Sequence, residues 1–169
     1  MRIAYIVLMF TIIFLHLLPL NFIPRGLVSP DWMLLFTFSW VLRMPKYAPI
    51  PLIAALFLLS DLIFLRPPGL WTALVIVACI RLRSLSGNLR TQTFMVEWLS
   101  VSITTVLFSI GYLFILAIFL YDIGSMDLFF LQLAVTILFY PVAVFVSQSI
   151  FNVRKPSPRD IDDTLGGRA

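Results

Sequence analysis

Charged residues are scarce in this sequence. Of its 169 residues, 12% are Asp, Glu, Lys or Arg, whereas 61% are hydrophobic. A soluble domain carries about 25% charged residues, so the composition excludes an ordinary soluble globular domain. The mean hydropathy of +1.03 indicates instead that most of the chain lies in a bilayer.

Cysteine and histidine are scarcer still, with one of each. A lone cysteine, Cys79, excludes an internal disulfide, and its place in an apolar run is typical of an inert buried thiol. With a single histidine, His16, catalytic triads of the Ser/His/Asp or Cys/His kind have poor support. No H-E-x-x-H, P-loop or G-x-G-x-x-G motif occurs. We therefore expect a protein that is not an enzyme and holds no cofactor or metal.

Six apolar segments predict an all-α integral membrane protein. The expected spans are 3–18, 27–42, 47–65, 68–83, 94–121 and 128–151, which gives a transmembrane domain over 1–152 and a disordered cytoplasmic tail over 153–169. The uncharged part of the fourth span, Leu70 to Ile80, covers only about 16 Å as a helix. A re-entrant hairpin of spans three and four is therefore the alternative topology. Pro141 predicts a kink in the last span.

The basic residues predict which way the spans run. If all six segments cross the membrane, ten of the twelve Lys and Arg residues fall on one side and only Arg25 and Arg66 on the other. Basic residues that flank spans stay cytoplasmic, so both termini are expected in the cytoplasm. The formal charge of +4 suits an anionic inner leaflet, and no water-facing basic stripe indicates nucleic-acid binding.

Four ionisable residues lie within or beside the spans, where each is costly. We expect His16 to be a hydrogen-bonded interfacial residue and Glu97 to be a first-turn carboxylate that reaches the cytoplasmic surface. Asp61 sits in an apolar run and needs either a buried partner or a water-filled outer cavity. Arg66 lies too far along a helix to face Asp61, and both could line an outward pocket.

Aromatic residues gather near the predicted span ends. Trp32, Trp40, Trp71 and Trp98 are typical of an interfacial belt. Asp31 is expected in the first turn of span two, beside the positive end of the helix dipole. From Asp31 to Leu42 this span is only about 18 Å long, too short to cross a bilayer alone.

Two stretches resemble the bacterial rod shape-determining MreD family. The first is Pro30-Asp-Trp-Met-Leu-Leu-Phe-Thr-Phe-Ser-Trp-Val-Leu-Arg-Met-Pro45, and the second is Ala54-Ala-Leu-Phe-Leu-Leu-Ser-Asp61-Leu, followed by Gly69-Leu70. A late Tyr140-Pro141 pair also fits that family. The resemblance covers roughly residues 28–83, and Arg66-Pro67-Pro68 departs from the small residues usual before the Gly-Leu turn.

The resemblance implies a scaffold of the rod complex in the bacterial inner membrane, acting in cell shape and peripheral peptidoglycan synthesis. It implies an MreC-like single-span partner and, through it, MreB, RodA and a class B penicillin-binding transpeptidase. It also implies a fold like the six-helix substrate-binding membrane components of vitamin-uptake transporters.

The short span two could meet such a partner. Trp32, Phe36 and Trp40 share one helix face at a spacing of four residues, beside Asp31. This stripe either contacts the partner's helix or packs inside the chain's own bundle. The alternative function is a small-molecule or lipid-binding transport component, in which Asp61 and Arg66 line an outward pocket.

Overall fold

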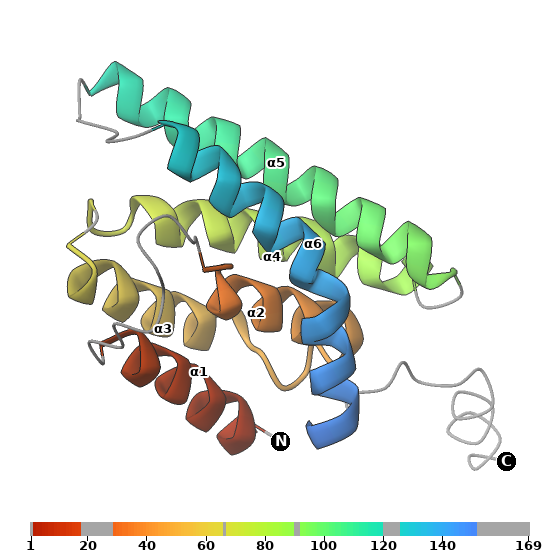
Figure 1. The fold of residues 1–169 in the computed structure, drawn as a ribbon. Helices are drawn as coiled ribbons and strands as arrows, with labels where there is room; N and C mark the ends of the chain where they lie inside the picture. The colour runs from red at the N-terminus through yellow and green to blue at the C-terminus, as the bar shows by residue number, and fades with distance from the viewer. Residues whose placement is uncertain (1, 18–28, 66, 90–91, 120–125, 152–169) are drawn as a thin grey trace, which may run out of the picture.

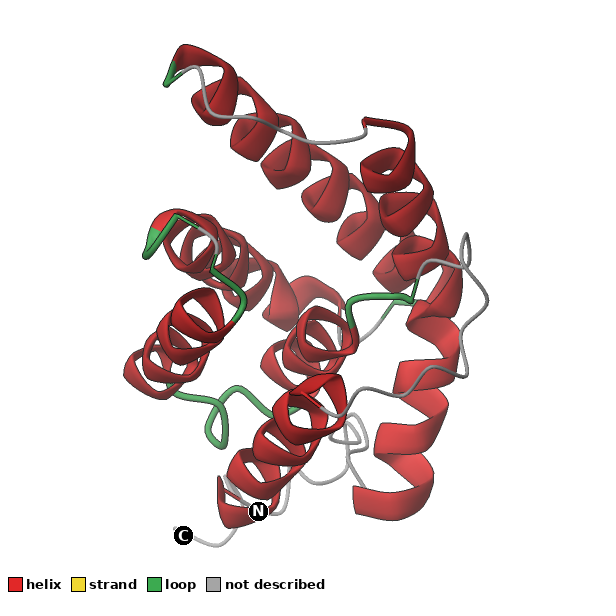
Figure 2. Cartoon of the chain, turned by 60° about the vertical axis from the view of Figure 1, so that its left-hand side comes forward, coloured by secondary structure: helices red, strands yellow, loops and turns green. Residues whose placement is uncertain are grey.

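The computed structural model describes residues 2–17, 29–65, 67–89, 92–119 and 126–151. These residues form helices and loops and contain no strand (Figure 2). The helices are α1 (Arg2–Leu17), α2 (Trp32–Arg43), α3 (Ile50–Ile63), α4 (Leu70–Leu89), α5 (Phe94–Ile118) and α6 (Met126–Phe151). The all-α prediction is confirmed. The proposed tail, 153–169, lies outside the described residues.

Three of these helices are long and apolar enough to cross a membrane by length and composition: α4, α5 and α6. The other three, α1 to α3, are shorter apolar helices of 16, 12 and 14 residues. The structure thus supports a membrane protein. Helix α4 continues through Arg81 and Arg83 and ends at Leu89, six residues beyond the predicted end at residue 83.

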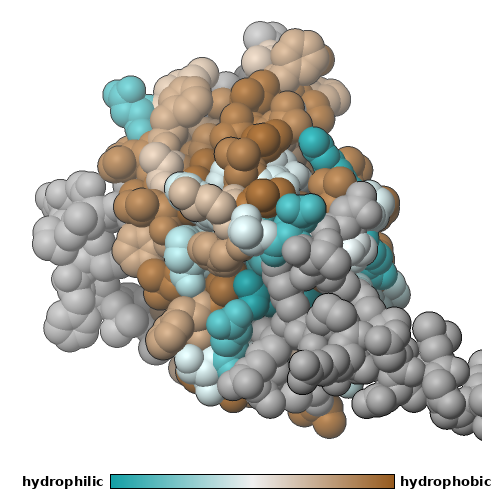
Figure 3. Space-filling model, turned by 90° about the vertical axis from the view of Figure 1, so that its right-hand side faces the viewer, coloured by the Kyte–Doolittle hydropathy of each residue, from teal (hydrophilic) through white to brown (hydrophobic). Residues whose placement is uncertain are grey.

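Successive helices run in opposite directions (Figure 1). One end of the bundle therefore holds the starts of α1, α3 and α5 together with the ends of α2 and α4. We call it the cationic end, because every lysine and arginine that the structure describes lies there: Arg2, Arg43, Lys46, Arg81 and Arg83. Figure 3 looks onto this end and shows hydrophilic side chains gathered beside a hydrophobic region.

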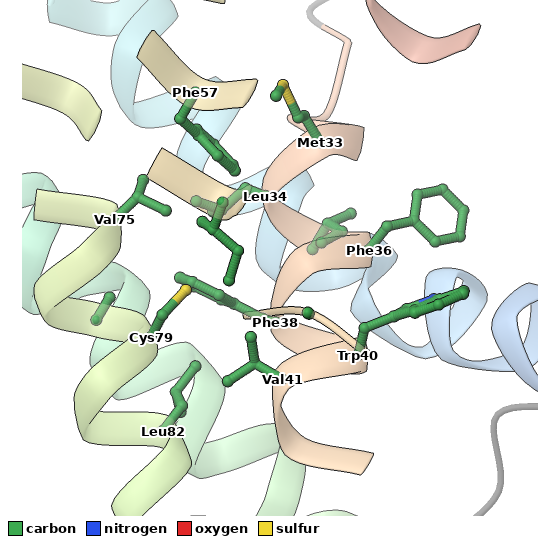
Figure 4. Close-up of a cluster of buried hydrophobic side chains, with 14 of the residues drawn as sticks. Met33, Leu34, Phe36, Phe38, Trp40, Val41, Phe57, Val75, Cys79 and Leu82 are labelled. Carbon is green, nitrogen blue, oxygen red and sulfur yellow. The ribbon is translucent and has the colours of Figure 1, made fainter. Parts of the chain in front are cut away.

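Helix α2 lies at the centre of the fold and packs against α1, α4 and α6. Eleven of its twelve residues are buried, which explains why so short a helix is apolar on all sides. Figure 4 shows Phe38 and Val41 pointing toward Cys79 and Leu82 of α4, while Phe36 and Trp40 point to the other side of α2. Cys79 is fully buried, as its sequence context predicts.

Local sequence signals set the helix starts. Asp31 precedes α2 as its N-cap, and its Oδ1 accepts the Leu34 N–H at 3.1 Å. Asp31 was expected in the first turn of this helix but lies one position before it, because the helix begins at Trp32 rather than near residue 27. Pro49 and Pro51 open α3, where their missing amide donors leave no helical hydrogen bond unmade.

Helix α6 changes direction near its middle, as Pro141 predicts (Figure 1). A proline at this position removes the helical donor for the carbonyl of Ile137, four residues earlier. That carbonyl instead accepts the indole N–H of Trp98 at 3.0 Å. The break in α6 thereby becomes a link to α5.

Candidate functional site

A buried polar junction joins α2, α5 and α6 toward the cationic end. Arg43 donates from Nε to Glu97 Oε1 at 3.2 Å and from Nη2 to Oε1 and Oε2 at 3.0 and 3.3 Å. The Tyr140 hydroxyl donates to the same Oε1 at 3.0 Å. Glu97 and Tyr140 are fully buried and Arg43 is 3% exposed. The three helices are therefore tied together by one carboxylate.

Glu97 corrects the expectation from sequence. The prediction of a carboxylate that reaches the cytoplasmic surface is wrong, because the side chain turns inward and pairs with Arg43. A long basic side chain of opposite charge removes the cost of burying it alone. Sequence reasoning counted Arg43 only as a loop cation. The available signal was that a glutamate in an apolar helix requires a partner.

A second buried carboxylate joins the end of α3 to the start of α4. Asp61 is fully buried, and its Oδ2 accepts the Gly69 N–H at 3.1 Å, the Thr72 N–H at 3.2 Å and the Thr72 hydroxyl at 2.8 Å. Asp61 thus satisfies backbone donors in the first turn of α4, as a capping residue does. Gly69 has a φ of +84°, which explains a glycine in this turn.

The predicted stripe on α2 lies inside the chain's own bundle. Trp40 is fully buried, and its ring packs against that of Tyr5 with the ring centroids 5.3 Å apart. Phe36 is also buried, and Trp32 packs against Phe139 of α6 at 5.8 Å. Partner contact through this face does not fit the structure, since α1 and α6 already cover it. The own-bundle interpretation holds.

The interfacial-belt prediction is wrong for two of the four tryptophans. Trp40 and Trp71 are buried in the core. Trp32 and Trp98 are partly buried and pack against that core. These tryptophans therefore act mainly as packing residues within the bundle.

Two cavities lie in the half of the bundle opposite the cationic end. The larger has a volume of about 210 Å³ and lies between the starts of α2, α4 and α6 and the C-terminal half of α5. The smaller, of about 140 Å³, lies between α1, α2, α3 and α6. Asp31, Trp71 and Gln132 line both, so these residues form the wall that the cavities share.

The other predicted residues are only partly placed together. His16 lines the smaller cavity, with Nδ1 3.3 Å from the Ile12 carbonyl oxygen and its ring 5.6 Å from that of Phe64. The hydrogen bond agrees with the expectation for His16. Arg66 lies outside the described residues. Asp61 lines neither cavity, whereas Asp31 lines both.

The fold and these polar contacts define an all-helical protein of membrane type. No family model, no curated protein and no solved structure matches the chain. The resemblance to MreD therefore rests on the residues quoted from the sequence. The structure gives several of these residues specific contacts, which are the basis of the proposal that follows.

Proposed function

We propose that this chain is a non-enzymatic scaffold of the rod complex in the bacterial inner membrane. It acts in maintaining rod shape and peripheral peptidoglycan synthesis together with an MreC-like single-span protein. Through that partner it is linked to MreB, RodA and a class B penicillin-binding transpeptidase.

The observation that carries the proposal is the structural use of the MreD-like residues. Asp31 caps α2, Trp40 fills the core, Arg43 joins α2 to α5, and Asp61 ties α3 to α4. The polar groups of the resembling stretches therefore serve to hold the bundle together. Helices whose polar groups are paired within the bundle and whose outer faces are apolar suit a scaffold that meets other helices in a bilayer.

The surface that remains for a partner is on the outer helices. Large hydrophobic side chains are exposed along α1, α5 and α6, among them Phe14, Phe114 and Phe145, at 62%, 66% and 68% exposure. In a bilayer such faces meet either lipid or another helix. We therefore place the partner contact on one of these helices and no longer on α2.

Photocrosslinking in cells tests the scaffold. Crosslinkers at Phe14, Phe114 and Phe145 sample one exposed face each, and the buried Trp40 supplies the matched control. We expect at least one exposed position to capture a single-span protein of the MreC type and Trp40 to give crosslinks within the chain only. Capture of lipid alone at all three exposed positions would contradict the scaffold.

We further propose six spans with both termini in the cytoplasm, which the gathering of described cations at one end supports. In a Cys79→Ala background, we expect Ser125→Cys to react with an impermeant maleimide added outside intact spheroplasts. Gly87→Cys and Ser157→Cys should react only after lysis; Ser125 and Ser157 lie outside the described residues. External labelling at Gly87 would rule out this topology.

The two cavities favour a second candidate function, the binding of a small molecule or lipid. Their walls combine aromatic rings with a carboxylate and an amide, which is the make-up of ligand sites more than of packing defects. Ligand that stays bound through detergent purification supports this function. Co-purification of a single-span protein supports the scaffold.

A further inference from the structure

The wall shared by the two cavities carries polar groups that the fold does not use. Asp31 Oδ1 accepts the Leu34 N–H, but no hydrogen bond from a described residue reaches Oδ2. Within the described ranges the Gln132 side chain likewise has no hydrogen bond, although it projects from an apolar membrane-type helix. Both residues are partly exposed and line the cavities, so these polar groups are accessible to a ligand there.

Four aromatic side chains form part of the wall of the larger cavity. Trp71 packs against Phe108 with ring centroids 5.2 Å apart and against Tyr112 at 5.0 Å, both edge to face. Tyr112 in turn stacks on Phe129 at 6.2 Å. These four side chains come from α4, α5 and α6 and all line the cavity. The negative faces of such rings attract cations.

The charge in the cavities has one sign. Among the described residues that line them, Asp31 is the only Asp, Glu, Lys or Arg, and His16 also lines the smaller cavity. A carboxylate beside several aromatic rings favours a weakly hydrated organic cation over an anion or a neutral molecule. Gln132 adds a carbonyl oxygen that can accept a hydrogen bond from the same ligand.

We propose that the cavities form a binding site for a small organic ammonium group. Asp31 is the counter-ion, Trp71 and its aromatic neighbours contact the alkyl groups on nitrogen, and Gln132 orients the adjoining polar atoms. The group comes either from a free solute or from the headgroup of an amine-containing lipid. This site gives the second candidate function its chemistry and does not depend on the scaffold, whose crosslinking test is independent.

A matched pair of probes tests the role of charge. Choline and 3,3-dimethyl-1-butanol have the same shape, but choline has a charged quaternary nitrogen where the alcohol has a neutral quaternary carbon. The full chain is purified into phosphatidylglycerol nanodiscs and checked by mass spectrometry for retained amine lipid. It is then titrated with each probe by calorimetry. We expect saturable binding of choline and roughly ten-fold weaker binding of the alcohol. No saturable choline binding, or equal binding of both, overturns the proposal.

A matched pair of variants tests the site. Asp31→Asn keeps an oxygen that can cap α2, so the fold is expected to persist while choline affinity falls roughly ten-fold. Asp127→Asn removes an exposed acid at the start of α6 and should leave the affinity unchanged. Unchanged affinity in Asp31→Asn, or an equal loss in Asp127→Asn, overturns the proposal.

Two further arms identify the source of the cation. Weaker choline binding in phosphatidylcholine nanodiscs than in phosphatidylglycerol nanodiscs supports a lipid headgroup, and equal binding supports a free solute.

Arg66, outside the described residues, follows the cavity residue Leu65 in sequence. If Arg66→Gln binds choline and the parent chain does not, the protein supplies its own cation. That result overturns the proposal of an external ammonium ligand.

Discussion

Glu97→Leu is expected to destabilise the protein by about 3–5 kcal/mol, because it leaves Arg43 buried without its counter-ion. The guanidinium is 3% exposed and makes three hydrogen bonds to this carboxylate, so water cannot replace the lost partner. The change also removes the acceptor of the Tyr140 hydroxyl. Reversible unfolding in detergent micelles, followed by circular dichroism, measures the effect.

The double variant Arg43→Met with Glu97→Leu distinguishes an ion pair from general packing. Replacing both charges with apolar side chains of similar size leaves no buried charge, so most of the lost stability should return. Arg81→Met, which removes an exposed cation from the same end, should have little effect. A double variant as unstable as Glu97→Leu would mean that the charge pair is not what holds this junction together.

Asp61→Leu is expected to weaken the connection between α3 and α4. It leaves the Gly69 and Thr72 N–H groups without their acceptor, at about 1–3 kcal/mol for each buried donor. The mean for hydrogen bonds between helices in membranes is lower, about 0.6 kcal/mol, and sets the lower bound. Unfolding in detergent and protein levels in cells measure the loss.

Asp61→Asn is the matched control, since its amide oxygen can accept the same hydrogen bonds. We expect it to fold nearly as well as the parent chain. Thr72→Val removes only the hydroxyl donor at 2.8 Å and should fall between the two. An Asp61→Asn protein present at normal levels that fails to support rod shape would show that the charge itself is needed.

Some features of the fold followed from local sequence. Two prolines mark the first turn of α3, Gly69 marks a turn with positive φ, and Pro141 marks the bend in α6. These effects act within a few residues, because proline removes a donor and glycine permits a backbone that other residues avoid. Asp31 was placed one position too far into α2, since composition alone does not separate the N-cap from the first turn.

The candidate sites were harder to predict. Asp61 was singled out as a carboxylate that needs a partner, and its partners lie on the next turn of the chain, within eleven residues. The partner of Glu97 is 54 residues away, and no local pattern points to it. The cavities around Asp31 depend on side chains from several helices, so sequence reasoning placed the outward pocket around Asp61 and Arg66 instead.

The sequence by itself determined that this protein is helical and of membrane type, because apolar composition and proline placement act along the chain without reference to tertiary contacts. Only the tertiary structure decided where the polar groups go. Helix α2 lies between other helices, so Trp40 and Phe36 are buried rather than presented to a partner. In the same way Glu97 turns from the surface toward Arg43, because packing α5 against α2 brings opposite charges together where neither can reach water.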